Sequence, residues 1–352
     1  MAQDVFAFID GTKCSYVTKT NIQKIHDLSQ KAGYPSKYQE GIGLVTRTPH
    51  FDQLLAPNLE PEAYKIYIRL LDLNLTSDDR IYIFGYSRGA VVARVLAKAI
   101  VSSSSLTAMV GRNVAPPAIM AKVQFLGLIE PVAGWPRFNR RKVKDHDAVF
   151  DPKIKNYLEL IALNETRKTF SSDSYSASKN ARLGVEGHPS KASFQTTKDR
   201  AADVDGLLIS KSRKCVWFPG HHSDVGGEEA DSSIGKHARM TMIEEVLASS
   251  NRGGAPVNFV KHDLMSIWNE NVLGSYRRTS QVKAFWAGLR KLISLPGRNR
   301  GVTLGNHVQH LRHPICHYEH PNKIRNIGKT NECLEYPDYP EIRKKLGIRN
   351  LS

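Results

Sequence analysis

The chain has 352 residues, of which 41% are apolar, enough to form a buried core, so global disorder is excluded. Its 50 basic and 34 acidic residues give a formal net charge of +16, which favours anionic partners such as nucleic acid or an anionic membrane surface. The apolar stretches are too short to cross a bilayer, and no disulfide framework is indicated by the scattered cysteines, Cys14, Cys215, Cys316 and Cys333.

The N-terminal segment leads directly into an apolar strand, expected at residues 4–9 and followed by the turn sequence Asp10-Gly11-Thr12. The first four residues lack the basic start and cleavage site of a secretory signal, so we expect synthesis in the cytoplasm without export by the general secretory pathway. Helices are expected at 21–31 and at 60–75. The second has Pro61 and two acidic residues near its start, which is typical of a first helical turn.

A Gly-x-Ser-x-Gly pattern follows the next predicted strand. Residues 81–84 form an apolar run, Gly85-Tyr86-Ser87-Arg88-Gly89 comes next, and residues 91–100 suit a helix. A serine on such a tight turn projects from the sheet, and glycines flank it because side chains there would collide with neighbouring backbone. The layout predicts a nucleophile elbow, with Ser87 at a helix N-terminus that favours an anionic intermediate.

Further strands and helices are expected in the rest of the chain. Strands are predicted at 123–128 and 214–218, and helices at 154–163, 234–248 and 260–272. Strands separated by helical segments predict parallel pairing, and therefore a three-layer α/β fold with a mostly parallel central sheet and helical or loop insertions.

The composition also divides the chain. Residues 1–280 are expected to form one α/β domain, with a polar insertion at about 171–213 that is rich in serine, lysine, glycine and aspartate. Residues 281–352 form a basic, histidine-rich extension that we expect to pack on this domain or complete it.

Six short segments within residues 3–247 together resemble, in the same order, one family of α/β-hydrolases. It is the family that includes the first class of bacterial type VI secretion lipase effectors. The matching segments are Phe8-Ile9-Asp10-Gly11-Thr12, Tyr38-Gln39-Glu40-Gly41-Ile42-Gly43, Phe84-Gly85-Tyr86-Ser87-Arg88-Gly89-Ala90 with Arg94, Phe125-Leu126-Gly127-Leu128 with Glu130, residues 162–170, and residues 216–227 with His222-Ser223-Asp224-Val225-Gly226-Gly227.

The resemblance implies ester hydrolysis by a serine nucleophile, with phospholipid as the substrate class of the effector members. A serine hydroxyl needs an imidazole to take its proton and a carboxylate to orient that imidazole. The chain order of nucleophile, acid and histidine is the one expected of α/β-hydrolases. The predicted catalytic residues are therefore Ser87 as nucleophile, His222 as base and Glu130 as acid.

The acid and the base each have alternatives. The family normally shows Trp-Asp-Thr-Val where this chain has Ile129-Glu130-Pro131-Val132, so the expected acid is one methylene longer. Asp224 is the alternative acid, unless it braces its loop through backbone hydrogen bonds. His221 precedes the preferred base and is expected near the site or on the surface. Because the base commonly lies late in such chains, His317 and His320 are reserve candidates.

The oxyanion hole is expected from two backbone segments. One donor is the N–H of Arg88, the residue after the nucleophile, and the others are Gly11 and Thr12 in the loop after the first strand. Asp10 is expected to hold this loop in shape, with contact to a cation as the alternative. The Arg88 side chain fits either an anionic head group or an ion pair that fixes the elbow.

No metal or cofactor is expected. The late histidines follow one another at steps of three to four residues, but no carboxylate pair or Cys-x-x-Cys accompanies them and Pro314 interrupts any helix. We interpret them as a surface loop. They are His307, His310, His313, His317 and His320.

The hypothesis from these patterns is a lipolytic hydrolase, in particular a phospholipase that acts on bacterial membranes after delivery to another cell by a dedicated secretion system. The expected partners are a lipid ester, an anionic membrane surface and an immunity or secretion-apparatus protein. Two alternatives stay open: a hydrolase scaffold with weakened catalysis that binds nucleic acid or a protein, and an esterase or thioesterase for a small substrate. The chain shows no compact nucleic-acid-binding module, so no specific nucleic acid is expected.

Overall fold

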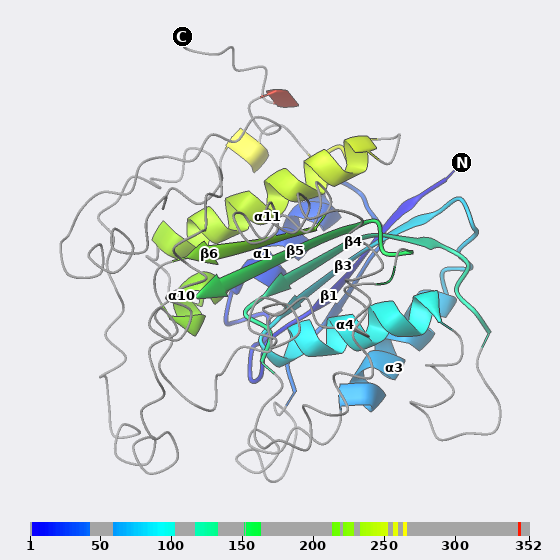
Figure 1. Cartoon of the computed structure of the whole chain (residues 1–352), viewed down its shortest axis with the longest axis horizontal. Coiled ribbons are helices and arrows are strands. Elements are labelled where there is room, and N and C mark those ends of the chain that lie inside the picture. Colours follow the sequence, from blue (N-terminus) through cyan, green and yellow to red (C-terminus); the bar gives the residue numbers. More distant parts are fainter. Residues whose placement is uncertain are drawn as a thin grey trace, which may run out of the picture.

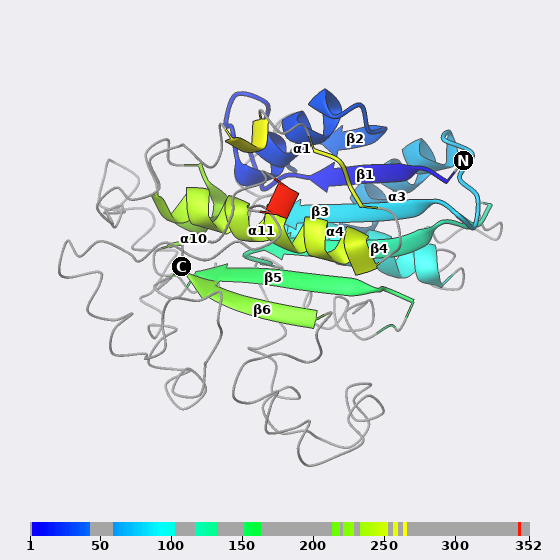
Figure 2. The same cartoon turned by 90° about the horizontal axis from the view of Figure 1, so that it is seen from above.

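The three-dimensional structure, a computed structural model, describes residues 2–42, 59–102, 117–132, 151, 153–162, 213–218, 221–228, 233–252, 256–259, 263–265 and 344–345. In this part of the chain the strands form one six-stranded sheet in which every neighbouring pair is parallel, in the order β2-β1-β3-β4-β5-β6. Figure 2 shows the strands side by side, with their arrowheads toward α10. The elements are β1 (Asp4–Ile9), α1 (Asn21–Lys31), β2 (Ser36–Gln39), α3 (Leu59–Leu71), β3 (Arg80–Tyr86), α4 (Arg88–Val101), β4 (Lys122–Ile129), β5 (Asn156–Ala162), β6 (Arg213–Phe218), α10 (His222–Gly226) and α11 (Ser233–Arg252).

Helices cover both faces of the sheet, as Figure 1 shows: α1 and α11 lie on one side, α3 and α4 on the other. Successive side chains of a strand point to opposite faces, so each strand contributes side chains to two apolar cores. In β1, Phe6 and Phe8 pack toward α1 and α11, whereas Val5 and Ala7 pack toward α3 and α4. The predicted three-layer α/β fold with a parallel sheet is therefore confirmed.

Most of the predicted elements are present, and one is wrong. The helix expected at 154–163 is the strand β5, which is buried along its whole length between β4 and β6. A strand covered on both faces carries apolar residues at successive positions instead of alternating ones, so its periodicity does not distinguish it from a buried helix. The helix expected to reach residue 75 ends at Leu71.

Two elements were not predicted. Strand β2 has the sequence Ser-Lys-Tyr-Gln and only one fully buried side chain, which is typical of an edge strand and gives little apolar pattern. Helix α10 has five residues and begins at His222, in the segment that the sequence suggested was a loop.

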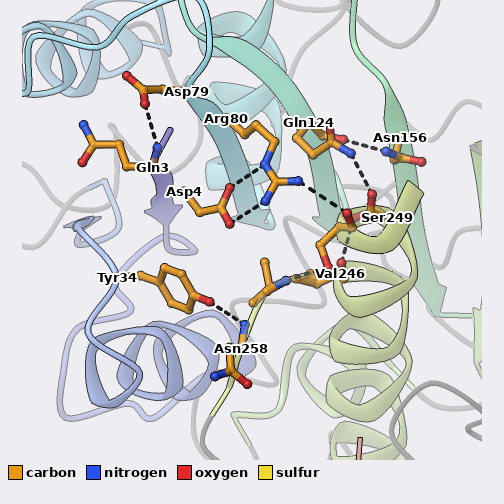
Figure 3. Close-up of polar contacts among 12 residues, drawn as sticks. Gln3, Asp4, Tyr34, Asp79, Arg80, Gln124, Asn156, Val246, Ser249 and Asn258 are labelled. Carbon is orange, nitrogen blue, oxygen red and sulfur yellow. Dashed lines mark hydrogen bonds and ion pairs between the residues drawn. The ribbon is translucent and has the colours of Figure 1, made fainter. Parts of the chain in front are cut away.

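Polar side chains join the starts of the strands to the end of α11 (Figure 3). Arg80, the first residue of β3, donates two hydrogen bonds of 2.7 Å to the carboxylate of Asp4, the first residue of β1. Its third nitrogen donates to the carbonyl oxygen of Ser250, and Gln124 donates to that of Ser249 at 2.7 Å. These bonds satisfy carbonyl groups at the C-terminus of α11 and hold the edge of the sheet opposite the predicted site.

Several predictions lie outside the described residues. They are the polar insertion before β6, most of the helix expected at 260–272, the reserve bases His317 and His320, and nearly all of the extension 281–352. From that extension, the amine of Lys345 donates to the carbonyl oxygen of Val257 at 3.1 Å. The division at residue 280 stays a prediction. None of the helices in the described ranges combines the length and apolar character needed to cross a membrane.

Candidate active site

The candidate catalytic residues lie after three different strands of the sheet. Ser87 follows β3, Glu130 follows β4, and His222 opens α10 four residues after β6. Because all of these strands run parallel, their carboxyl ends meet at one edge, where ligands bind in open α/β sheets. The sheet topology therefore brings together the three residues that the sequence suggested.

The Gly-x-Ser-x-Gly turn is as tight as expected. Ser87 has φ 56° and ψ −122°, a strained conformation for a residue with a side chain. A Cβ on Gly85 would lie 2.5 Å from the Cα of Ala90, and a Cβ on Gly89 would lie 2.4 Å from the carbonyl oxygens of Ile9 and Asp10. Only glycine fits at both positions, so β1 and α4 approach closely enough to place Ser87 at the end of the sheet.

A continuous chain of hydrogen bonds joins the three side chains. Nε2 of His222 lies 2.8 Å from Oγ of Ser87, and its Nδ1 lies 3.0 Å from Oε2 of Glu130. In the tautomer whose Nδ1 carries the proton, Nδ1 donates to the Glu130 carboxylate, which only accepts hydrogen bonds, and Nε2 accepts from the Ser87 hydroxyl. All three residues are buried, which strengthens these contacts relative to water. The arrangement can transfer a proton from Ser87 to His222.

Glu130 is held by the backbone of β5 at two points. Its N–H donates to the carbonyl oxygen of Leu160 at 2.8 Å, and its Oε1 accepts from the N–H of Ala162 at 2.5 Å. The residue has φ 48°, so the chain turns sharply as it leaves β4. These contacts direct the second carboxylate oxygen toward His222 and compensate for the longer side chain that stands in the acid position.

Asp224, the alternative acid, has a different place. Its Oδ2 accepts from the backbone N–H of His221 at 2.7 Å, which caps the start of α10. Asp224 thus braces the loop through a backbone hydrogen bond, while the carboxylate at Nδ1 of His222 belongs to Glu130. His221 is buried beside the site, so the structure does not place it on the surface.

The loop after β1 is fixed by Asp10. Its carboxylate accepts three hydrogen bonds of 2.7 Å, from the hydroxyls of Thr20 and Tyr38 and from the N–H of Gly11. Burial raises the pKa of this carboxyl to about 6, against the lowering effect of these donors. Thr20 also caps α1 by accepting from the N–H of Gln23 at 3.2 Å. Thr20 was not among the predicted site residues, although a threonine directly before a predicted helix indicates a cap.

The engagement of Gly11 corrects the predicted oxyanion hole. Its N–H already donates to Asp10, so it is not available to an oxyanion in this structure. Arg88 begins α4, and the N–H groups in the first turn of a helix point out of its N-terminal end along the helix axis. Thr12 lies next to Gly11, and the Oγ1 atom of its side chain is buried without a hydrogen-bond partner. Thr12 and Arg88 are thus the candidates that the geometry leaves.

The Arg88 side chain is a buried cation next to the nucleophile in the sequence. Burial lowers the pKa of the Arg88 guanidinium to about 10, so it keeps its positive charge at neutral pH. The described residues contain no group of three or more His, Cys, Asp or Glu side chains arranged to hold a metal ion. Cys14, buried near this loop, is a free thiol.

The family described as "T6SS, Phospholipase effector Tle1-like, catalytic domain" matches residues 4–118 and 103–245 of the chain. The chain belongs to this family. The resemblance seen in the sequence motifs is therefore confirmed. The matched region of this Tle1-like chain contains β1 to β6 together with Ser87, Glu130 and His222.

Three of the solved structures similar to this Tle1-like chain have low sequence identity to it. An uncharacterized protein from Pseudomonas aeruginosa is 18% identical, with a TM-score of 0.41, over 73% of this chain and 47% of its own. The Tle1 effector bound to the VgrG spike of the type VI secretion system is 18% identical, with a TM-score of 0.34, over 64% and 51%. A protein of unknown function from Agrobacterium tumefaciens is 14% identical, with a TM-score of 0.36, over 73% and 88%. The chain spans about half the length of the first two, and no curated protein matches it.

Proposed function

We propose that this chain is a serine hydrolase that cleaves carboxylic esters of phospholipids. The observation that carries the proposal is the buried hydrogen-bond chain from Ser87 through His222 to Glu130. A serine whose hydroxyl donates to an imidazole, itself oriented by a carboxylate, is equipped for nucleophilic attack on a carbonyl carbon. Membership of the Tle1-like phospholipase effector family supports the choice of substrate.

In the first half of the proposed reaction, Oγ of Ser87 attacks the ester carbonyl while Nε2 of His222 takes its proton. The tetrahedral intermediate carries its negative charge on the former carbonyl oxygen, where the N–H groups of Thr12 and Arg88 stabilise it. The carbon–oxygen ester bond then breaks, and the imidazolium returns the proton to the departing alcohol. Glu130 stabilises the imidazolium throughout and stays ionised.

In the second half, water replaces the alcohol. His222 takes a proton from the water as its oxygen attacks the acyl carbon bound to Ser87, and it returns that proton to Oγ when the fatty acid leaves. The products are a fatty acid and the alcohol portion of the lipid, and the enzyme is regenerated. No oxidant, reductant or cofactor is needed for this balance.

The charge of the chain supports a membrane substrate. A formal net charge of +16 concentrates a protein on anionic bilayers, which offer many esters in one surface. The family is described as one of type VI secretion effectors, so we extend delivery to another cell, and contact with a secretion-apparatus or immunity protein, to this chain.

The test measures turnover by the purified protein on phosphatidylglycerol vesicles and on p-nitrophenyl butyrate. Ser87→Ala removes the proposed nucleophile and should reduce both rates to background. Ser77→Ala is the matched control, because Ser77 lies in the exposed turn before β3, at the opposite edge of the sheet, and its removal should leave both rates unchanged.

Three outcomes separate the alternatives. Hydrolysis of vesicles that Ser87→Ala abolishes supports the phospholipase. Turnover of the soluble ester alone, equally dependent on Ser87, contradicts the lipid substrate and favours a small-molecule esterase. Turnover that survives Ser87→Ala, or a folded protein without any turnover, contradicts the serine hydrolase.

A further inference from the structure

Tyr86 lies at the centre of the candidate site, immediately before Ser87 at the end of β3. Two glycines make room for its ring. A Cβ on Gly11, in the loop after β1, would lie 2.6 Å from Cδ1 of Tyr86, and a Cβ on Gly226, at the end of α10, would lie 2.3 Å from Cζ. Both distances are too short for any side chain. The ring therefore fills the space between the loop after β1 and the helix that carries His222.

The same ring contacts His222 itself. The two ring centroids lie 4.9 Å apart with an angle of 29° between their planes, so the imidazole stacks on the phenol. The imidazole is thus bordered on three sides, by the ring of Tyr86, by Oγ of Ser87 and by the carboxylate of Glu130.

The hydroxyl of Tyr86 makes further contacts with the segment after His222. It lies 3.2 Å from the carbonyl oxygen of His222 and in hydrogen-bond contact with Oε1 of Glu228. Burial and the negative charge of Glu228 hold the pKa of Tyr86 well above its ordinary value, so the hydroxyl stays protonated and donates. The backbone of Glu228 closes the loop, because its N–H donates to the carbonyl oxygen of Ser223 at 3.1 Å.

We propose that Tyr86 and Glu228 act together as a positioning pair that holds His222 in line with Ser87 and Glu130. The inference rests on the proposed hydrolase function and extends it to two residues that act through His222. The ring of Tyr86 sets one side of the imidazole, and the bond from its hydroxyl to Glu228 fixes the turn that follows His222. Proton transfer depends on distances of about 3 Å, so a displacement of the imidazole reduces turnover more than substrate binding.

The pair is separated by 142 positions in the sequence, and its two members have different exposure. Tyr86 is fully buried, whereas Glu228 is an exposed residue whose carboxylate reaches inward to the hydroxyl. A substitution at Glu228 thus removes the contact without opening a cavity in the core. This makes the contact testable without a large loss of stability.

The test is a double-mutant cycle of Tyr86→Phe and Glu228→Ala, measured as kcat and KM on p-nitrophenyl butyrate. Each single change should reduce kcat about tenfold with KM nearly unchanged, which corresponds to one lost hydrogen bond. The double variant should be no slower than either single one, because both remove the same contact. Glu228→Gln keeps an acceptor oxygen and should therefore retain most of the wild-type kcat, unlike Glu228→Ala.

Tyr82→Phe is the matched control. Tyr82 lies on the same face of β3 as Tyr86, and its buried hydroxyl has no hydrogen-bond partner, so its removal should leave kcat unchanged. Additive losses in the double variant, a loss confined to KM, or normal kcat in Tyr86→Phe would overturn the pair. Ser87→Ala in the same assay distinguishes failure of the positioning role from failure of the proposed hydrolase function. Turnover that survives Ser87→Ala contradicts both. An inactive Ser87→Ala together with a fully active Tyr86→Phe contradicts only the positioning role.

Discussion

Nε2 of His222 lies 2.8 Å from Oγ of Ser87, although 135 positions separate the two residues in the chain. The distance results from parallel strands that end at one edge of the sheet and from a strained turn that places the serine there. Backbone hydrogen bonds join this turn to the end of β4 and the residues that follow it. The N–H of Ser87 donates to the carbonyl oxygen of Ile129 at 2.9 Å, and the carbonyl oxygen of Ser87 accepts from the N–H of Val132 at 3.2 Å. The position of Ser87 is therefore fixed by the backbone of the sheet.

The identity of the acid can be tested by charge removal. Glu130→Gln keeps the shape of the side chain but removes the carboxylate at Nδ1 of His222, so the imidazole loses its orientation and the imidazolium its counter-charge. We expect kcat to fall by about 10³-fold to 10⁴-fold, measured by steady-state kinetics on a soluble ester.

Asp224→Asn is the matched control for the acid, since it makes the same change at the competing carboxylate. It weakens the cap of α10 and should reduce kcat by about tenfold or less. A larger loss in Asp224→Asn than in Glu130→Gln would show that the acid has been assigned to the wrong residue.

The close approach of β1 and α4 can be tested at Gly89. A Cβ in Gly89→Ala meets two backbone carbonyl oxygens at 2.4 Å, and neither can move without displacing the strand, so we expect a loss of about 3 kcal/mol or more in the free energy of unfolding. In Gly33→Ala the Cβ meets no atom within 4 Å but the residue has φ 79°, so only backbone strain of about 1 kcal/mol is expected. Urea denaturation measures both, and equal losses would contradict the packing argument.

The buried carboxyl of Asp10 predicts a pH dependence of stability. Its pKa in the folded chain is about 6, above the ordinary value of 3.8, because burial and the nearby Glu228 disfavour the charged form. The folded state therefore binds a proton more tightly than the unfolded state between these values. The contribution of Asp10 to stability is fully present below pH 3.8 and is lost as the pH rises through 6, a change of about 3 kcal/mol.

Asp10→Asn isolates this contribution because it removes the titrating group and keeps an oxygen acceptor. The difference in unfolding free energy between the wild type and Asp10→Asn should shift by about 2 kcal/mol against the wild type from pH 4 to pH 7. Urea denaturation at several pH values measures it. A difference that is constant across this range would contradict the raised pKa.

A buried ion pair joins α4, the helix that follows Ser87, to strand β5. Nη2 of Arg94 in α4 is 3.3 Å from Oε1 of Glu159 in β5, and the hydroxyl of Tyr157 donates to the other carboxylate oxygen at 3.0 Å. Glu159→Leu leaves the guanidinium buried without this carboxylate, so we expect a loss of about 3–5 kcal/mol in unfolding free energy. Combining it with Arg94→Met should recover most of that loss, as measured by urea denaturation. A double variant as unstable as the single one would contradict a simple pair.

The sequence was most informative where local patterns decide the structure. Apolar patterns were sufficient for β1, α1 and β3, and the spacing of Gly85, Ser87 and Gly89 predicted the tight turn. Strand β5 was mistaken for a helix because a strand buried on both faces has no alternating pattern. Edge strand β2 was missed because it has little apolar content.

At the site, too, local motifs were informative and contacts between distant residues were not predicted. The family motifs indicated Ser87, Glu130 and His222, but they did not show that the N–H of Gly11 is taken by Asp10, since that contact depends on the shape of the loop. The contact between Tyr86 and Glu228 joins residues 142 positions apart, and no local pattern marks either as part of a pair. Contacts of this kind follow from tertiary packing.

The central claim is that the imidazole of His222 activates the hydroxyl of Ser87. Its most direct measurement is the reaction of the folded protein with a fluorophosphonate probe, followed by mass spectrometry of the labelled peptides. The account predicts labelling at Ser87, a rate reduced to background by His222→Ala, and an unchanged rate in Ser77→Ala. A folded protein whose Ser87 stays unlabelled, or is labelled equally fast without His222, would contradict it.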